Sequence, residues 1–308
     1  MSIVRCPFNF DRNLDRVREF LLEVYNSAGS LHYLIPTKIE NQKYGPCGTD
    51  YSPKDDEAIK IWKRPGKDCA DIIAVSHRGS SANYHIEIHP DYKSLEPELF
   101  LEIEKLERSI SPERNARMYM YTVGPDSMRA SVLAEMDFED YGLHEFNYRF
   151  PQDKPIPDNL LPEGFTVRGL EGEEDYPKFI KVIGSVYDHC HRYMTIQKMK
   201  FMTQAEFYDR DLNLVMINHD GNFVGFCMYR LDPLTRIAEM EALGVHPDFA
   251  DLGLESALLS EGLRRLMKYQ PNFVCAVEID VSDQLNQFLE SAGFVRSATM
   301  NQWGKMIN

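Results

Sequence analysis

Residues 241–259 constrain the fold of this chain more than any other stretch. They predict a short buried strand over 237–245, which ends because Pro247 has no N–H to continue a strand ladder. A helix with one apolar face follows over 255–268. A loop that feeds a helix leaves backbone N–H groups without intrahelical partners, and the helix dipole adds positive potential there. The stretch therefore predicts an anion site suited to a pyrophosphate.

Length and charge limit the possible classes of protein. The chain has 308 residues, which predicts two domains at about 150 residues each. It has 34 Lys and Arg against 48 Asp and Glu, a net charge of −14, which disfavours nucleic acid and anionic lipid as partners and is compatible with a cationic amine. No apolar run approaches the roughly 18 residues of a membrane span, and the first residues lack a long apolar region, so we expect a cytoplasmic protein.

Cysteine and histidine usage does not favour a metal site. The six cysteines are scattered without a C-x-x-C pair, which is typical of reduced thiols. Residues 188–191 read Asp-His-Cys-His, but neighbouring side chains at a helix end point apart, so solvated residues are favoured over a ligand set.

The first half of the chain predicts alternating helices and strands. Residues 31–58 have weak periodicity, predicting an ordered loop with a short helix. This connection is long enough to suggest that it carries function. The apolar patterns predict helices over 14–28, 99–110 and 127–136, and strands over 58–62, 71–76, 84–89, 118–123 and 143–150.

The second half predicts a similar order of elements. Residues 151–158 are proline-rich and polar, typical of a semi-rigid linker. We therefore expect domains over 1–150 and 163–308, joined by a linker over 151–162. The second domain predicts strands over 165–168, 214–217, 223–229, 237–245 and 273–281, and helices over 176–187, 255–268 and 284–291.

Two short words recur at nearly one spacing. The sequence Ile-His-Pro-Asp-Tyr at 88–92 echoes Val-His-Pro-Asp-Phe at 245–249, and 132–138 echoes 288–294. The agreement of two landmarks with the order of elements favours a duplicated domain over a chance match of short apolar words.

The second copy of the strand–turn–helix unit resembles motif A of the GNAT superfamily of N-acetyltransferases. That motif ends a strand in Val-x-Pro and continues as Arg/Gln-x-x-Gly-x-Gly/Ala into a helix. Here Ala250 stands at the Arg/Gln position, Gly253 keeps the first glycine and Glu255 stands at the second. Residues 283–294 are similar to motif B, with Gly293 and Phe294 matching and Asp283 where the family usually has Asn.

The resemblance implies two tandem GNAT-like domains, each a twisted mixed α/β (α+β) sheet flanked by helices. It implies acetyl transfer from acetyl-CoA, as cosubstrate, to a small amine or a peptide N-terminus. The backbone of Leu243, Gly244 and Val245 would hold the pantetheine, and the N–H groups of residues 251–256 the pyrophosphate. The implied cofactor-binding residues are Leu243, Gly244, Val245, Ala250, Asp251, Leu252, Gly253, Leu254, Glu255, Ser256 and Asp283.

Glu241 is the predicted general base, because the family often places a glutamate near the middle of this strand. Its alternative is a carboxylate paired with Arg or Lys on a solvated edge, and both interpretations stay open. A base would need a pKa raised by partial burial. The family's usual Tyr acid is missing, since Leu289 stands near its position, and no acid is assigned. Tyr187 and Tyr193 are the predicted substrate-binding residues.

Departures from the family pattern favour a second hypothesis. Ala250 offers no cation to a pyrophosphate, and Glu255 and Asp251 bring carboxylates to the loop. In the first half, both glycine positions of the loop at 93–98 are glutamates and Pro97 lacks an N–H, so we expect no CoA binding there. The alternative is a catalytically inactive GNAT-fold module that binds a small molecule or a protein. The sequence does not predict the oligomeric state.

Overall fold

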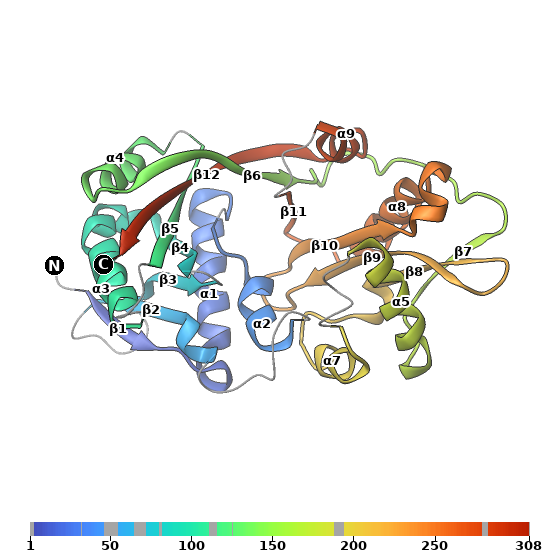
Figure 1. Ribbon diagram of the computed structural model, residues 1–308, viewed down its shortest axis with the longest axis horizontal. Helices are drawn as coiled ribbons and strands as arrows, with labels where there is room; N and C mark the ends of the chain where they lie inside the picture. The colour runs from blue at the N-terminus through green and yellow to red at the C-terminus, as the bar shows by residue number, and fades with distance from the viewer. Residues whose placement is uncertain are drawn as a thin grey trace.

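The computed structural model describes residues 3–31, 33–45, 55–64, 72–79, 82–110, 116–124, 126–187, 194–278 and 283–307. The described strands form a four-stranded antiparallel sheet and an eight-stranded mixed sheet, and helices lie along both (Figure 1). The α/β fold class predicted from the sequence is confirmed. Among these residues, no helix combines the length and the apolar character that crossing a bilayer requires.

The first half contains a four-stranded sheet and four helices. α1 runs over Phe10–Ala28 because apolar residues recur on one face, and it ends at Gly29, which takes a left-handed φ of 75°. The predicted short helix within 31–58 is α2, over Pro36–Tyr44. The remaining elements are β1 (Val4–Pro7), β2 (Ile59–Lys63), β3 (Ile72–Arg78), β4 (Tyr84–Ile88), α3 (Glu96–Ile110), β5 (Ala116–Val123), α4 (Ser127–Glu135) and β6 (Glu139–Arg149).

The second half repeats this order. β10 occupies Ile237–Val245, the range predicted from the sequence, and the other predicted elements differ at their ends by a few residues. The remaining elements are β7 (Phe165–Gly169), α5 (Tyr176–Val186), α7 (Ile196–Met202), β8 (Asn213–Asn218), β9 (Phe223–Leu231), α8 (Leu254–Met267), β11 (Phe273–Glu278), α9 (Asp283–Ser291) and β12 (Val295–Ile307).

The two halves exchange strands. The larger sheet has the order β5-β12-β6-β11-β10-β9-β8-β7, so β6 of the first half lies between β11 and β12 of the second. Reciprocally, β12 lies between β5 and β6, and Figure 1 shows these two long strands running together across the molecule. The predicted division at residues 151–162 remains a prediction, but hydrogen bonding continues across it.

Side-chain packing follows the exchange. Phe146 and Tyr148 of β6, and Phe150 directly after it, are buried in the core of the second half. Trp303 and Ile307 of β12 are buried in a core of the first half. Each half therefore depends on the other for part of its hydrophobic core.

Candidate functional site

β10 separates from β11 at Glu241. The parallel pairing of β10 with β11 runs from Ile237 to Met240. The antiparallel pairing with β9 continues to Val245, with a bulge between Met240 and Ala242 that leaves Glu241 as the extra residue. Residues 241–245 of β10 are thus paired with β9 but not with the described residues of β11. This splayed edge is where the sequence predicted that the pantetheine would lie.

The Glu241 carboxylate lies beside a buried cation. Its Oε1 is 2.9 Å from Nη2 of Arg230, whose side chain is 3% exposed, while the Glu241 side chain is 27% exposed. Burial raises the pKa of Glu241 to about 7, opposed by Arg230 and supported by the like charge of Glu239. The ion pair of the alternative interpretation is present, and so is the raised pKa that a base requires.

The splayed strand packs closely against α5. The hydroxyl of Tyr187, the residue after α5, donates a hydrogen bond of 3.1 Å to the carbonyl of Leu243. A Cβ on Gly244 would come within 2.6 Å of Cγ1 of Val186, so a larger residue at 244 would push α5 away. Tyr187 therefore lies at the predicted cradle, beside Leu243, Gly244 and Val245.

The predicted phosphate loop is a short helix instead of an open loop. A 3-10 helix, η6, covers Pro247–Leu252 and includes Ala250, Asp251 and Leu252, all exposed. Gly253 follows with a φ of 68°, in the left-handed region that favours glycine, and no atom lies within 4 Å of the Cβ position. α8 begins at Leu254, one residue earlier than predicted, with Leu254 in the core and Ser256 half-buried. The start of the helix therefore faces open space beside Gly253.

Two carboxylates lie near the start of α8. Glu255 is in the first turn of α8, and its carboxylate accepts a hydrogen bond from its own backbone N–H. Burial raises the pKa of Glu255, and the nearby Asp251 adds to the rise. Glu255 thus occupies part of the helix start, as its position in the sequence suggested.

Motif B contributes structure rather than a proton donor. Leu289 is 1% exposed and packs in the core. Its aliphatic side chain has no proton to donate, so this position supplies no general acid. Asn286 is buried and accepts a hydrogen bond of 2.5 Å from the Tyr148 hydroxyl of β6. Asp283 begins α9, but its side chain lies outside the described residues, as do Tyr193 and residues 188–191.

The first half contains a closed version of the same unit. A 3-10 helix, η3, covers Pro90–Leu95 and leads directly into α3 at Glu96. The Glu96 side chain is fully buried, and its Oε1 lies 2.5 Å from Nη2 of Arg129, whose side chain is 3% exposed. An internal ion pair occupies this helix start, and the absence of CoA binding by this half stays a prediction.

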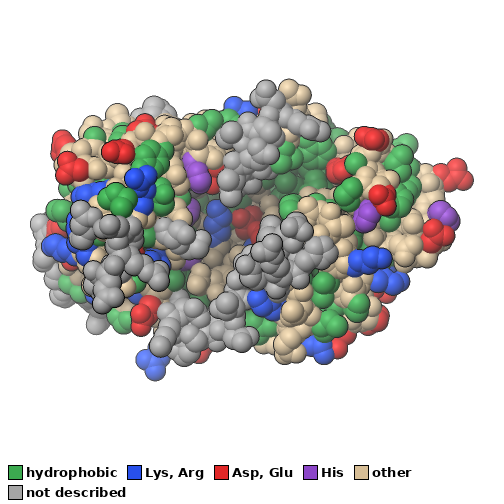
Figure 2. All heavy atoms as spheres, in the orientation of Figure 1, with side chains coloured by type: hydrophobic (Ala, Val, Ile, Leu, Met, Phe, Trp, Pro, Cys, Tyr) green, Lys and Arg blue, Asp and Glu red, His purple; other side chains and the backbone are tan. Residues whose placement is uncertain are grey.

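A hollow in the middle of the face in Figure 2 contains basic, acidic and histidine side chains. Charged groups from both halves interact with one another near β10. Lys38 of α2 interacts electrostatically with Glu145 of β6 and with Glu239 and Glu241 of β10. Burial and, to a lesser extent, the charge of Lys38 together lower the pKa of His77 to about 4.

Ring contacts extend this mixed group. The rings of His85 and Tyr121 are stacked, with centroids 4.8 Å apart, and His144 lies 5.3 Å from Tyr121. The sequence analysis did not identify His85, Tyr121, His144, Lys38 or Arg230 as functional residues. The one available signal was the unusual length of the connection at 31–58, which contains Lys38.

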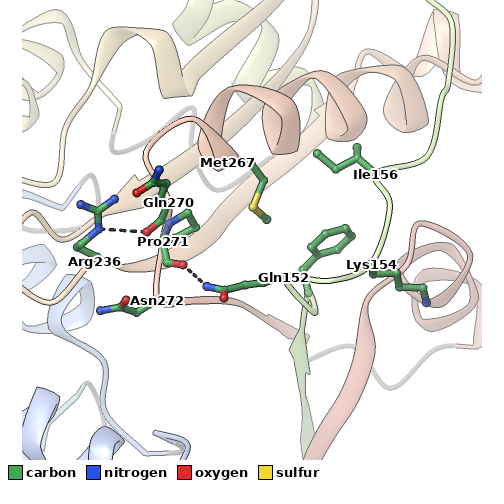
Figure 3. A pocket seen from close by; sticks show the side chains of 9 residues that line it. Gln152, Lys154, Ile156, Arg236, Met267, Gln270, Pro271 and Asn272 are labelled. Carbon is green, nitrogen blue, oxygen red and sulfur yellow. Dashed lines mark hydrogen bonds between the residues drawn. The ribbon is translucent and has the colours of Figure 1, made fainter.

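A separate cavity of about 770 Å³ lies at the opposite end of β10. Figure 3 shows Met267 and Ile156 facing it and Arg236, just before β10, at its edge. Arg236 donates through Nε to the carbonyl of Gln270, and Gln152 donates to the carbonyl of Pro271. This cavity lies beneath the linker and contains none of the predicted site residues. The described residues also contain no group of three or more potential metal ligands.

The second half matches a known sequence family. Residues 181–294 match the model of the acetyltransferase (GNAT) family, a range that includes Glu241, η6 and α8. A mycothiol acetyltransferase of Thermomonospora curvata is 29% identical over 149 residues, 48% of this chain and 50% of that protein. A mycothiol acetyltransferase of Frankia casuarinae is 24% identical over 77% of this chain and 73% of that protein. The chain spans about half the length of the first of these curated relatives.

Solved structures match the whole chain. A tandem GNAT protein from the clavulanic acid biosynthesis pathway aligns with a TM-score of 0.69 at 12% identity, covering 100% of this chain and 98% of that one. A GCN5-related N-acetyltransferase from Sphaerobacter thermophilus aligns with a TM-score of 0.64 at 16% identity, covering 99% and 96%. The fold and the splayed β10 define a tandem GNAT architecture. Residues 181–294 match the acetyltransferase (GNAT) family, as the resemblance in the motifs of the second half indicated.

Proposed function

We propose that this chain transfers the acetyl group of acetyl-CoA to a small amine. Acetyl-CoA would lie along Leu243, Gly244 and Val245, with its pyrophosphate at the start of α8. The observation that carries the proposal is the position of Glu241. It is the extra residue of the bulge where β10 leaves β11, and its pKa is raised to about 7.

The start of α8 is suited to a pyrophosphate through its backbone. The first N–H groups of a helix have no intrahelical acceptor, and the helix dipole makes this end positive. Gly253 leaves room for the ligand to approach. Backbone donors would supply most of the binding, because Ala250 provides no cation.

Glu241 would act as the general base. An amine is protonated at neutral pH and attacks only after it loses a proton, which Glu241 would accept directly or through water. The neutral amine nitrogen then forms a bond to the thioester carbonyl carbon, and the carbon–sulfur bond breaks to release CoA as a thiolate. The nitrogen gives up its second proton to that thiolate or to water, which leaves the neutral amide. A thiolate is a good leaving group, so the reaction does not require a general acid near position 289, where the family usually has Tyr.

The acceptor would bind in the hollow between the two halves. Carboxylates and imidazoles lie around the Lys38 ammonium near Glu241, and such surroundings suit a small polar amine better than an apolar one. The curated relatives are called mycothiol acetyltransferases, which supports a small-molecule acceptor over a peptide N-terminus. The identity of the acceptor stays open within this class.

The test is CoA release in the presence of a library of small amines, followed as a function of pH. We expect kcat/KM to rise tenfold per pH unit below about 7 and to level off above it, because Glu241 accepts a proton only when ionised. Calorimetric titration with acetyl-CoA provides a separate readout. Absence of both binding and release at millimolar acetyl-CoA would contradict the proposal.

A binding module without catalysis is the second candidate. Ala250 and Glu255 favour it, because both weaken the pyrophosphate site. This candidate predicts ligand binding with no CoA release. Release that disappears in Glu241→Gln would exclude it.

A further inference from the structure

α2 comes from the first half of the sequence but lies against the active-site strand of the second. Figure 1 shows it between α1 and α7. Thr37 is fully buried, and its Oγ1 donates a hydrogen bond of 2.8 Å to Oε2 of Glu239 in β10. This contact places the residue next in sequence, Lys38, near the carboxylates of β10.

A buried ion network fixes α2 in this position. Arg18 of α1 is 1% exposed, with Nη2 3.1 Å from Oε2 of Glu40 and Nε 2.6 Å from Oδ2 of Asp232. Glu40 belongs to α2, and Asp232 follows β9 of the second half. The second oxygen of Glu40 accepts the backbone N–H of Glu206 at 2.6 Å. Breaking a buried ion pair leaves an uncompensated charge in the interior, so the network holds α2 firmly on the second half.

Lys38 lies near carboxylates of β10 and β6 and near neutral imidazoles of β3 and β4. Burial alone would lower the pKa of Lys38, but the carboxylates outweigh it and raise the pKa, so Lys38 stays a cation. The groups that interact with it are Glu239 and Glu241 of β10, Glu145 of β6, Cys275 of β11, His77 of β3 and His85 of β4. Burial and Lys38 together lower the pKa of both histidines, so they do not compensate the carboxylates with charge.

We propose that Lys38 is a positioning residue for the transfer reaction, which keeps Glu241 ionised at neutral pH from across the interface between the halves. This inference rests on the proposed function. Arg230 of β9 stabilises the Glu241 anion through an ion pair, while burial and Glu239 act against it. Lys38 is the second cation that offsets Glu239 and burial, so the first half supplies part of the active site's electrostatics without holding acetyl-CoA.

The experiment compares pH profiles of kcat/KM for Lys38→Met, Lys38→Arg and the unaltered chain. In K38M we expect the acidic limb to move upward by on the order of one pH unit, because a unit charge is lost near Glu241. The rate at pH 6 should fall about tenfold, while the plateau at high pH changes little. K38R keeps the charge and should restore the original limb.

A matched control lies on the same helix. Lys43 is 3.6 Å from Asp11 and stacks near the rings of Phe10 and Tyr44, away from β10, so K43M should leave the limb unchanged. If K38M does not fold, Lys38→Gln removes the same charge with a polar side chain. A limb that stays in place in a folded K38M or K38Q overturns the inference. An unaltered chain without any acetyl transfer overturns the proposed function instead, so the two failures are distinguishable.

Discussion

The two strand–turn–helix units of this chain begin alike and end differently. In both, a histidine closes the strand and its Nδ1 accepts the backbone N–H two residues later at 3.2 Å, from Asp91 to His89 and from Asp248 to His246. In both, a six-residue 3-10 helix follows. The units separate at the next residue, which is Gly253 in one and Glu96 in the other.

That single position decides whether the helix start is open. Gly253 turns the chain through a left-handed conformation and leaves space beside the first turn of α8. Glu96 has a φ of −51°, continues directly into α3 and carries a buried carboxylate that Arg129 neutralises. The difference shows how two units with the same strand and 3-10 helix can present an open helix start in one case and an internal ion pair in the other.

The largest expected effect is on the closed unit. Replacing Arg129 with Met leaves the Glu96 carboxylate buried without its partner, so stability should fall by about 3–5 kcal/mol. Chemical denaturation measures this loss. K105M, at an exposed pair with Glu102, should change stability by less than about 1 kcal/mol. Equal effects of the two variants would contradict an internal ion pair as the element that closes this helix start.

The next effect concerns the base of the open unit. Glu241→Gln keeps the size of the side chain but cannot accept the proton, so kcat/KM should fall about 100-fold or more. Affinity for acetyl-CoA should stay within about threefold in calorimetry, since the amide still fits. Glu102→Gln on the exposed side of α3 provides the control and should retain full activity. An active E241Q would leave Glu241 with only its ion-pair role.

A third variant converts the open unit toward the closed one. Gly253→Glu places a carboxylate and a strained positive φ at the helix start, so the Kd for acetyl-CoA should rise about tenfold or more. Gly221→Glu is the matched control, because Gly221 has a φ of 76° in the exposed turn between β8 and β9. It carries similar strain far from α8 and should bind normally. Weakened binding in both would indicate a general loss of stability.

The smallest effect should be a gain. Glu255→Gln removes a carboxylate from the start of α8, so acetyl-CoA should bind about threefold to tenfold more tightly. The gain should grow as pH rises, because burial and Asp251 raise the pKa of Glu255 and its charge develops only above that pKa. Glu98→Gln, the counterpart in the first half, should have no effect on binding. Unchanged affinity in E255Q would place the pyrophosphate away from this side chain.

Sequence patterns predicted a helix or strand well where its apolar pattern is clear and a residue such as proline or glycine marks its end. β10 was predicted over its full range, because a buried strand bounded by proline leaves little ambiguity. The family pattern pointed to a glycine at 253 but not to its left-handed φ, and the glutamates of the first unit were expected to prevent CoA binding but not to form a buried pair with Arg129. β1, β12 and α7 were not predicted as elements, since their patterns are short or mixed and their partners are distant in sequence.

The charged residues that act on Glu241 could not be predicted from the sequence. Arg230 and Lys38 act on Glu241 only because β9, α2 and β10 meet in space, over separations that no local pattern records. The raised pKa of Glu241 is likewise a property of burial by distant residues. Only the length of the connection at 31–58 indicated that α2 has a role.

The exchange of β6 and β12 bears on the order in which the chain can fold. β6 is synthesised more than a hundred residues before β11 and β12, the strands that pair with both of its edges. Contacts of such long range slow folding, and until they form β6 exposes an unsatisfied strand edge that favours aggregation. Either half produced alone retains such an open edge, so we expect each half to depend on the other for folding.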